Sequence, residues 1–404
     1  MKLSHGLGLA LAGMCSVGLF VGAGLSTGCG SSSGGGSSSS GGSGSSGGGN
    51  DLCSQLTKSN PSACTEPPTA PTSGTATMSK HNYALHKLYM GDTDRMGVTN
   101  PDAWKSFGYD LDGKITTQAS TDVCTLVAGA SKSVQIDGNG GIDNSFGANI
   151  MPIIGTLDST ASQTVNNTIE QGSFTVLSYV VGFDDTAGNM TSATGLSGVL
   201  LAGGNYPAAH DGGAPTWDLN THWPVRPELL NCYQGMTDNC TSSTDPIAAA
   251  NVKFPMAFQN KGTFVNGSPS LLSLSLTIGG NTITLNVHSA IVSFDPQMPG
   301  SVTNGTIAGV IDTTELIMGL KQIAGHISTS LCSGSAFQSI ASQIEQTSDI
   351  VVSGDTVSNT TGTMCNGISV GLGFDSTEIA LPTGADIAPM TVQSPDPCAD
   401  AGTD

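Results

Sequence analysis

The chain has 404 residues, of which 31 are acidic and only 12 are Lys or Arg, so its net charge is −19 at pH 7. Such an acidic chain is a poor partner for nucleic-acid phosphates and for an anionic membrane surface. Charged residues make up only 11% of the chain, which excludes a charge-rich coiled coil. We therefore expect no nucleic-acid partner.

The first 28 residues have the organisation of an export signal. Lys2 precedes an uncharged apolar stretch over residues 6–25, which is typical of a signal peptide. Residues 25–29, Leu-Ser-Thr-Gly-Cys, resemble a bacterial lipobox, although the Leu lies one position further from the Cys than usual. We expect residues 1–28 to be removed and Cys29 to carry the lipid. A retained transmembrane anchor is the alternative, since the apolar stretch could just span a bilayer.

A flexible tether and one large domain are expected after the signal. Residues 29–50 combine the lipidated Cys with a run of Gly and Ser, which cannot bury apolar area. An irregular, Cys-containing lead-in follows over 51–79, then a single β-rich globular domain over 80–389 and an acidic tail over 390–404. This organisation predicts a protein of the bacterial envelope, at the outer membrane or cell surface, that contacts the membrane through its lipid only.

Eight cysteines follow the lipidation site, and an even number in an exported chain indicates disulfides. They are Cys53, Cys64, Cys124, Cys232, Cys240, Cys332, Cys365 and Cys398. Pairing by proximity along the chain gives Cys53–Cys64, Cys232–Cys240 and Cys332–Cys365, which leaves Cys124 for Cys398. Many other connectivities stay open. Zinc is not expected, because the chain has no CxxC spacing.

Strand patterns dominate the domain. Apolar and polar residues alternate over 272–278 and 283–287, on either side of Gly279-Gly280, which predicts a β-hairpin with one buried face. Large apolar residues also alternate with Ser or Gly over 368–374, so another backbone can approach the Gly face of that strand closely. Further buried strands are expected over residues 174–181 and 199–201.

Helical patterns are fewer. Apolar residues over 316–327 recur at helical spacing, and Asp312 with Glu315 forms a start similar to a capping box. A second helix is expected over 337–344, and weaker helical patterns cover 82–90 and 161–171. Because strands dominate and no βαβ alternation is visible, we expect a mainly β fold. Its core would be an antiparallel β-sandwich or jelly roll with a few packed helices.

Carboxylate and amide side chains gather in two neighbouring segments, DLDG at 110–113 and DGNGGIDN at 137–144. Calcium binds six to eight oxygens from such groups. The candidate ligands are Asp110, Asp112, Asp137, Asn139, Asp143 and Asn144. An EF-hand is excluded, since Ile142 and Ala148 occupy its Gly and Glu positions. Asx-turns at strand ends are the simpler interpretation, and a calcium site is the alternative that stays open.

Enzyme motifs are scarce. The one GxSxG of the domain, at 367–371, lies within the alternating pattern of a strand, so we do not expect a nucleophile elbow. Two Trp and two polar residues form a loop that offers a sugar-binding surface, although packing of the Trp rings is the simpler interpretation; they are Trp217, Asp218, His222 and Trp223. A hydrolase would need a Ser–His pair or convergent carboxylates, for which His210 and Glu228 are the added candidates.

Three segments resemble predicted surface lipoproteins of the myxobacterial type. They are AWKSFGYDLDGKIT at 103–116, GIDNSFG at 141–147 and CNGISVGLGF at 365–374. The middle step of the family pattern, at 169–174 here, differs in detail. The resemblance implies one unit over 104–374 and surface lipidation, and it favours a role for the acidic segments. It implies no substrate and no catalytic residue, because the group has no established activity.

The sequence thus favours a non-enzymatic, lipid-anchored surface protein whose β-rich domain binds an extracellular ligand. Calcium is the candidate ion for bracing its loops. A secreted hydrolase of glycans or esters and a structural component of the envelope are the alternatives. Neither the ligand nor the oligomeric state follows from the sequence.

Overall fold

The computed structural model describes residues 65–389, apart from positions 158, 187–189, 235–236, 269, 279–280, 328 and 333. The expected signal, Cys29, the tether, the Cys53–Cys64 bridge, the Gly279-Gly280 turn and the acidic tail lie outside the described residues. Within the described part, none of the helices has both the length and the apolar character needed to traverse a bilayer.

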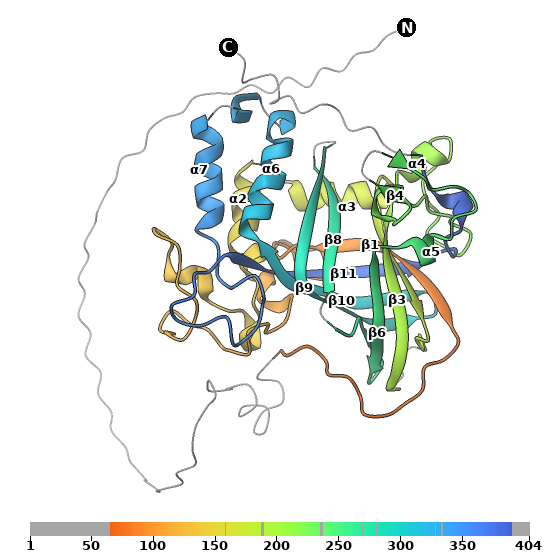
Figure 1. The fold of residues 1–404 in the computed structure, drawn as a ribbon, viewed down its shortest axis with the longest axis horizontal. Coiled ribbons are helices and arrows are strands. Elements are labelled where there is room, and N and C mark those ends of the chain that lie inside the picture. The colour runs from red at the N-terminus through yellow and green to blue at the C-terminus, as the bar shows by residue number, and fades with distance from the viewer. Residues whose placement is uncertain are drawn as a thin grey trace, which may run out of the picture. The chain divides into compact units, whose positions relative to one another are not determined.

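One antiparallel sheet of nine strands dominates the described part of the chain (Figure 1). Its strands are β1 (Lys80–Tyr89), β2 (Thr175–Val181), β3 (Ala193–Gly203), β6 (Val252–Asn260), β7 (Thr263–Val265), β8 (Ser270–Ile278), β9 (Asn281–Met298), β10 (Ser301–Asp312) and β11 (Gly367–Glu378). Eight of them close on themselves in the order β10-β11-β1-β2-β3-β6-β7-β9, because β9 also pairs with β10. The mainly β, antiparallel class is confirmed, whereas the expected sandwich or jelly roll is wrong, because the sheet closes into a barrel.

Closure depends on the length of β9, which has 18 residues. One edge of β9 pairs with β8 through Asn281–Ala290 and then with β7 through Ser293 and Phe294. Its other edge pairs with β10. Because β9 pairs with β7 and β8 along one edge and with β10 along the other, it joins the two ends of the sheet. This joining closes the barrel. β8 extends the sheet beyond this closure.

The helices pack against the barrel, and most of them contribute side chains to the same apolar core as its interior. They are α2 (Met151–Leu157), α3 (Ala161–Glu170), α4 (Tyr206–Ala209), α5 (Pro246–Ala249), α6 (Thr313–Ile327) and α7 (Gly334–Glu345). Single turns occur at η1 (Ala103–Ser106), η2 (Lys132–Gln135), η3 (Asn139–Gly141), η4 (Phe146–Ile150), η5 (Pro227–Leu229), η6 (Thr329–Cys332) and η7 (Gly384–Asp386), and a small separate sheet joins β4 (Tyr233–Gln234) to β5 (Thr237–Asp238). Figure 1 shows α6 and α7 side by side near β8 and β9.

Three of the four expected helices are confirmed. The carboxylate of Asp312 accepts hydrogen bonds from the Thr314 and Glu315 amides at 2.8 and 3.0 Å, so it caps α6 as expected. The helices expected over 337–344 and 161–171 are α7 and α3. The helix expected over 82–90 is wrong, because these residues form β1. A β-bulge between Leu85 and Lys87 shifts the alternation of buried residues by one, which imitates a helical period.

The barrel interior is filled with side chains. Rings of Tyr83, Phe183, Phe264 and Phe294 pack mostly edge to face, with centroids 4.6 to 6.4 Å apart. A cavity lined by Leu85 and its neighbours measures only about 10 Å³, which is the volume of at most one water molecule. This part of the barrel is therefore a packed core and offers no room for an organic ligand.

The strand expected over 368–374 is confirmed as β11, and its Gly face is in close contact with another segment. A Cβ atom at Gly371 would lie 2.1 Å from the Phe107 carbonyl oxygen, and one at Gly373 would lie 2.4 Å from the Phe107 ring. The acidic segments of the chain begin immediately after Phe107, so these two glycines allow that region to dock on the outer face of the barrel.

Candidate metal centre

Three of the six candidate calcium ligands converge in the structure. One carboxylate oxygen each from Asp110, Asp112 and Asp143 lies within 4.8 Å of the others. All three residues are buried, with exposed fractions of 3%, 1% and 5%. Asp110 and Asp112 share a loop that begins the described acidic region, while Asp143 follows the turn η3. Two segments about thirty positions apart therefore bring their carboxylates to one point.

Asn144 fixes this region to the barrel. Its Nδ2 donates to the carbonyl oxygens of Phe107 and Gly371 at 3.1 and 3.0 Å, and its Oδ1 accepts from the amides of Gly147 and Gly371 at 2.9 and 3.0 Å. The side-chain amide thus replaces a strand partner at Gly371, where β11 extends beyond its pairing with β1. Its side-chain oxygen already accepts two backbone hydrogen bonds. Asn144 therefore positions the acidic residues and is not itself an ion ligand.

A disulfide between Cys124 and Cys365, 241 residues apart in the chain, ties the same region to the start of β11. The expected pairings Cys332–Cys365 and Cys124–Cys398 are therefore wrong. They failed because α7 and a further segment separate Cys332 from Cys365, so proximity along the chain does not become proximity in space. Cys332 is also disulfide-bonded. The Cys232–Cys240 bridge is confirmed.

Backbone amides already orient the three carboxylates. Asp143 Oδ2 accepts from the Leu111 amide at 2.7 Å, Asp110 Oδ1 from the Gly113 amide at 2.7 Å, and Asp112 Oδ1 from the Lys114 amide at 2.9 Å. Asp110 and Asp112 are therefore held in local turns of the Asx type, as the sequence suggested, whereas Asp143 is held by a segment 32 positions away. Both oxygens of Asp112 accept hydrogen bonds, since Asn359 donates to Oδ2. These hydrogen bonds and an ion site are compatible, because a carboxylate offers about four lone-pair sites.

Gly141 packs tightly against the acidic region. A Cβ atom on this residue, whose φ is +87°, would lie 2.9 Å from Asp110 Oδ2 and 3.0 Å from the carbonyl oxygen of Lys114, which is too close for any side chain. Only Gly fits here, and its backbone therefore lies beside a carboxylate oxygen and a backbone carbonyl oxygen. Both are ligand types that calcium prefers.

Burial and mutual repulsion strongly affect these acids. Burial, with the charge of Asp112 second, raises the pKa of Asp110 to about 7. Burial also raises the pKa of Asp112, and burial together with the surrounding carboxylates raises the pKa of Asp143 well above its ordinary value. Hydrogen bonds from backbone amides act in the opposite direction but do not outweigh burial. Burial therefore favours the uptake of protons or of a cation by these carboxylates.

Two further acids border the three. Asp137 accepts a hydrogen bond from the Thr116 amide, and burial raises its pKa to about 9. Asp349, which the sequence analysis missed, is buried, accepts from the Ser369 hydroxyl at 2.5 Å and has a pKa raised by burial to about 7. Asn359, also missed, donates to Asp112 Oδ2. The sixth candidate, Asn139, is exposed, and its Nδ2 donates to Ser106 Oγ at 3.1 Å.

The expected sugar-binding loop is partly core. Trp223 is 2% exposed, and its Nε1 donates to the Gly204 carbonyl oxygen at 2.9 Å. Trp217 is partly buried and stacks on His86 with ring centroids 4.3 Å apart. The exposed Asp218 accepts hydrogen bonds from its own turn, for example from the Asn220 amide at 2.8 Å. Sugar binding by this loop stays a prediction.

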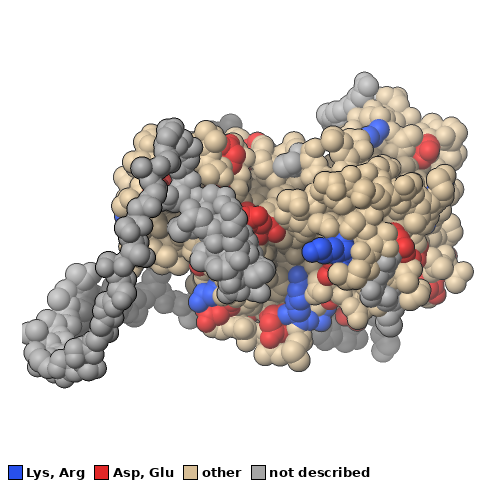
Figure 2. Space-filling view, turned by 90° about the horizontal axis from the view of Figure 1, so that it is seen from below, with Lys and Arg blue, Asp and Glu red and all other residues tan. Residues whose placement is uncertain are grey.

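The candidate hydrolase groups pair with different partners. His222 Nδ1 lies 3.4 Å from Asp386, and Glu228 lies 3.5 Å from Arg226. Ser369 of the GxSxG sequence is buried within β11, as its alternating pattern predicted. On the face drawn in Figure 2, acidic and basic side chains form small groups within a largely uncharged surface.

We expect the calcium-free protein to become more stable as the pH falls from 9 to about 5. The pKa values of Asp110 and Asp137 in the fold, about 7 and about 9, exceed the ordinary value of 3.8. The folded state therefore binds protons that the unfolded chain has lost, and the free energy of unfolding decreases with rising pH by about 1.4 kcal/mol per unit for each titrating carboxyl. Urea denaturation in EDTA across this range measures it. A stability that increases with pH would contradict the prediction.

Comparison with known proteins found no counterpart: no family model matches the chain, and no curated protein or solved structure matches it.

Proposed function

We propose that this protein is a lipid-tethered surface protein of the bacterial envelope whose barrel serves as a binding module braced by calcium. The observation that carries the calcium part is the convergence of Asp110, Asp112 and Asp143 in a buried position. The tether and its lipid rest on the sequence of the first fifty residues. The binding role rests on the filled barrel core, which leaves recognition to the loops and outer faces.

The donor set suits calcium better than other common ions. All nearby donors are oxygens, from carboxylates and from the Lys114 carbonyl, and calcium prefers six to eight such ligands at 2.3–2.6 Å. Ligands on opposite sides of one calcium ion are about 5 Å apart by that geometry, so oxygens within 4.8 Å of one another are compatible with a shared ion. A divalent cation would also neutralise charge that burial makes costly.

The position of the centre indicates a bracing role. A bound ion would join the loop of Asp110 and Asp112 to the segment of Asp143. Asn144 and the Cys124–Cys365 bridge in turn fasten both segments to β11. The ion would therefore stiffen loops on the outside of the barrel, where an extracellular ligand has access. Each of these contacts is structural, which supports a binding protein over an enzyme.

Isothermal titration calorimetry of the EDTA-stripped full chain tests the calcium proposal. We expect about one equivalent of Ca²⁺ to bind and Mg²⁺ to bind more weakly, because Mg²⁺ demands a tighter octahedral site. Asp143→Asn should abolish the heat of binding. Asp102→Asn, which alters an exposed carboxylate paired with Lys105, is the matched control. A wild-type protein that shows no heat of Ca²⁺ binding would refute the calcium proposal.

Mass spectrometry of the mature N-terminus tests the tether separately. Expressed in a bacterium with a lipoprotein pathway, the protein should begin at Cys29 and carry acyl chains on it. Cys29→Ala should release the protein from the membrane fraction. An unmodified N-terminus elsewhere in the wild-type protein would refute lipidation and leave the calcium proposal untouched.

A further inference from the structure

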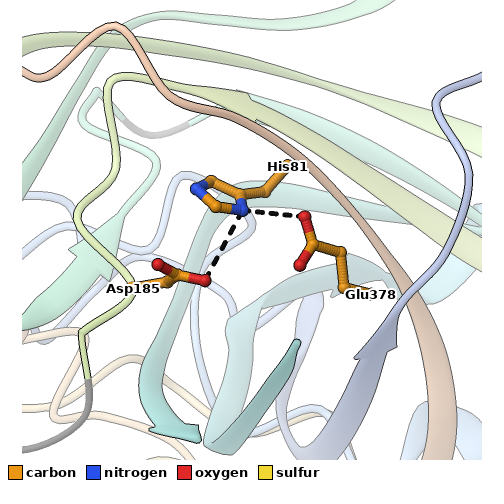
Figure 3. A group of neighbouring side chains, drawn as sticks. All are labelled: His81, Asp185 and Glu378. Atoms are coloured by element: carbon orange, nitrogen blue, oxygen red, sulfur yellow. Dashed lines mark hydrogen bonds and ion pairs between the residues drawn. The ribbon is translucent and has the colours of Figure 1, made fainter. Parts of the chain in front are cut away.

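A second cluster of potential ligands lies at one end of the barrel, and it contains nitrogen. His81 belongs to β1, Asp185 follows β2, and Glu378 ends β11. Figure 3 shows the same ring nitrogen of His81 facing both carboxylates. His81 Nδ1 lies 2.8 Å from Glu378 Oε1 and 3.6 Å from Asp185 Oδ2. One ligand atom from each residue lies within 4.8 Å of the others.

The fold shields this cluster without sealing it. The side chains of His81, Asp185 and Glu378 are 12%, 25% and 14% exposed. His81 is two residues before Tyr83 on β1, so both side chains point toward the barrel interior, and their rings stack with centroids 5.6 Å apart. Phe183 contacts both rings edge-on. The cluster therefore lies between the aromatic core and the solvent, and an ion could enter from the solvent side.

Tyr83 lies directly beside the cluster. It is 1% exposed, and its hydroxyl faces the Asp185 side chain. Tyr83 is also the cross-strand partner of Glu378, so the two side chains project from the same face. A neighbouring hydroxyl of this kind can orient a carboxylate that binds a metal ion.

We propose that His81, Asp185 and Glu378 bind a divalent transition-metal ion of the zinc type, with the Tyr83 hydroxyl turned toward it. Imidazole nitrogen with two carboxylates is a donor set for Zn²⁺ and similar ions, whereas calcium prefers oxygen alone. Two carboxylates also balance the charge of a divalent ion when the imidazole is neutral.

The distances allow this ion with a small adjustment. Ligands about 2.1 Å from a tetrahedral zinc are about 3.4 Å apart, close to the 3.6 Å between His81 and Asp185. The 2.8 Å between His81 and Glu378 would have to widen by about 0.6 Å, which a rotation of the Glu378 side chain supplies. This separation is that of a hydrogen bond, so the protein without metal holds a proton in the same position.

The proton is the competing occupant. Metal binding must displace this proton, and affinity for the metal should therefore decrease as the pH falls below neutrality.

Calorimetry with Zn²⁺ on the full chain, after chelator treatment and in saturating Ca²⁺, tests the inference. Saturating Ca²⁺ keeps Zn²⁺ out of the proposed calcium site, so the heat of Zn²⁺ binding reports on the His81 cluster alone. We expect one equivalent of Zn²⁺ and, with Co²⁺, a visible absorption band typical of a low-coordinate site. His81→Gln and Glu378→Gln should each weaken binding by at least tenfold, since even residues that only orient ligands contribute that much.

Two other His–carboxylate pairs of the described chain provide matched controls. His222 lies 3.4 Å from Asp386 and His288 lies 3.4 Å from Glu315, and neither is in a group of three ligands. His222→Gln and His288→Gln should leave Zn²⁺ binding unchanged. Tyr83→Phe, which keeps the packing, should reduce the affinity for Zn²⁺ without lowering the melting temperature.

Two results would overturn the inference. The first is a wild-type protein that takes up no Zn²⁺ or Co²⁺. The second is Zn²⁺ uptake that His81→Gln and Glu378→Gln leave unaltered while both variants fold. In either case the cluster is a protonated His–carboxylate ion pair, whatever the outcome for calcium.

Discussion

Replacing Asp110 or Asp143 with Asn should have opposite effects with and without calcium. Without the ion, each substitution should raise the melting temperature by a few degrees, because it removes the free-energy cost of burying a charge or of taking up a proton on folding. With calcium, the substituted protein should lose the stabilisation that the ion provides. The Asn side chain still has one oxygen for the backbone amides that Asp110 and Asp143 now bind, so folding itself is preserved.

The size of the calcium effect follows from mass action. Calcium at one hundred times its dissociation constant stabilises the folded state by about 2.7 kcal/mol, or about 5 °C in melting temperature for a domain of this size. Calorimetric melting with EDTA or with 1 mM Ca²⁺ measures both effects. Asp102→Asn, at an exposed position, should match the wild type in both buffers. Variants that melt lower without calcium would show that the carboxylates stabilise the fold by themselves.

Removing the Cys124–Cys365 disulfide should destabilise the protein more than removing Cys232–Cys240. The two bridges close segments of 241 and 8 residues. In the chain-entropy model, the loss of unfolded-chain entropy stabilises the folded state by about 5.5 kcal/mol for the first bridge and about 2.5 kcal/mol for the second. The double variant Cys124→Ser/Cys365→Ser also frees the acidic region from β11. We therefore expect the candidate metal centre to lose its structure before the barrel does.

Chemical denaturation of the two double-Ser variants measures the difference. We expect Cys124→Ser/Cys365→Ser to unfold at a clearly lower urea concentration than Cys232→Ser/Cys240→Ser, and its calcium affinity to fall. The variant Cys232→Ser/Cys240→Ser should keep the calcium affinity of the wild type, because its bridge packs against buried side chains of β2 and β3. Equal loss of stability in the two variants would mean that other contacts hold the acidic region in place.

Local patterns in the sequence predicted local structure well. Alternation predicted β8, β9 and β11, Asp312 predicted the start of α6, and the Gly face of β11 correctly indicated a close backbone contact. Closure of the barrel could not be predicted, since it depends on one long strand having three partners. The alternation of apolar residues is the same in a sandwich and in a barrel. β1 was missed because its bulge imitates the spacing of a helix.

The candidate metal centre was predictable only where its residues are close in sequence. The DLDG and GIDN segments predicted Asp110, Asp112 and Asp143. Asp349 and Asn359 gave no signal, because they lie more than two hundred residues further along the chain and only the folding of β11 brings them near. For the same reason, the spacing of cysteines could not predict Cys124–Cys365. The cluster of His81, Asp185 and Glu378 gave no signal either, since three separate elements contribute to it.

The bridge between Cys124 and Cys365 would couple the oxidation state of the protein to the calcium binding proposed above. The disulfide fastens the acidic region to β11, and the proposed calcium ion would join two segments of that same region, so each should make the other harder to remove, and by the same free energy. Calcium would then protect the disulfide from reductants, and reduction would release calcium. In a reducing compartment the chain would hold neither, so its acidic region would acquire its final form only where the thiols are oxidised.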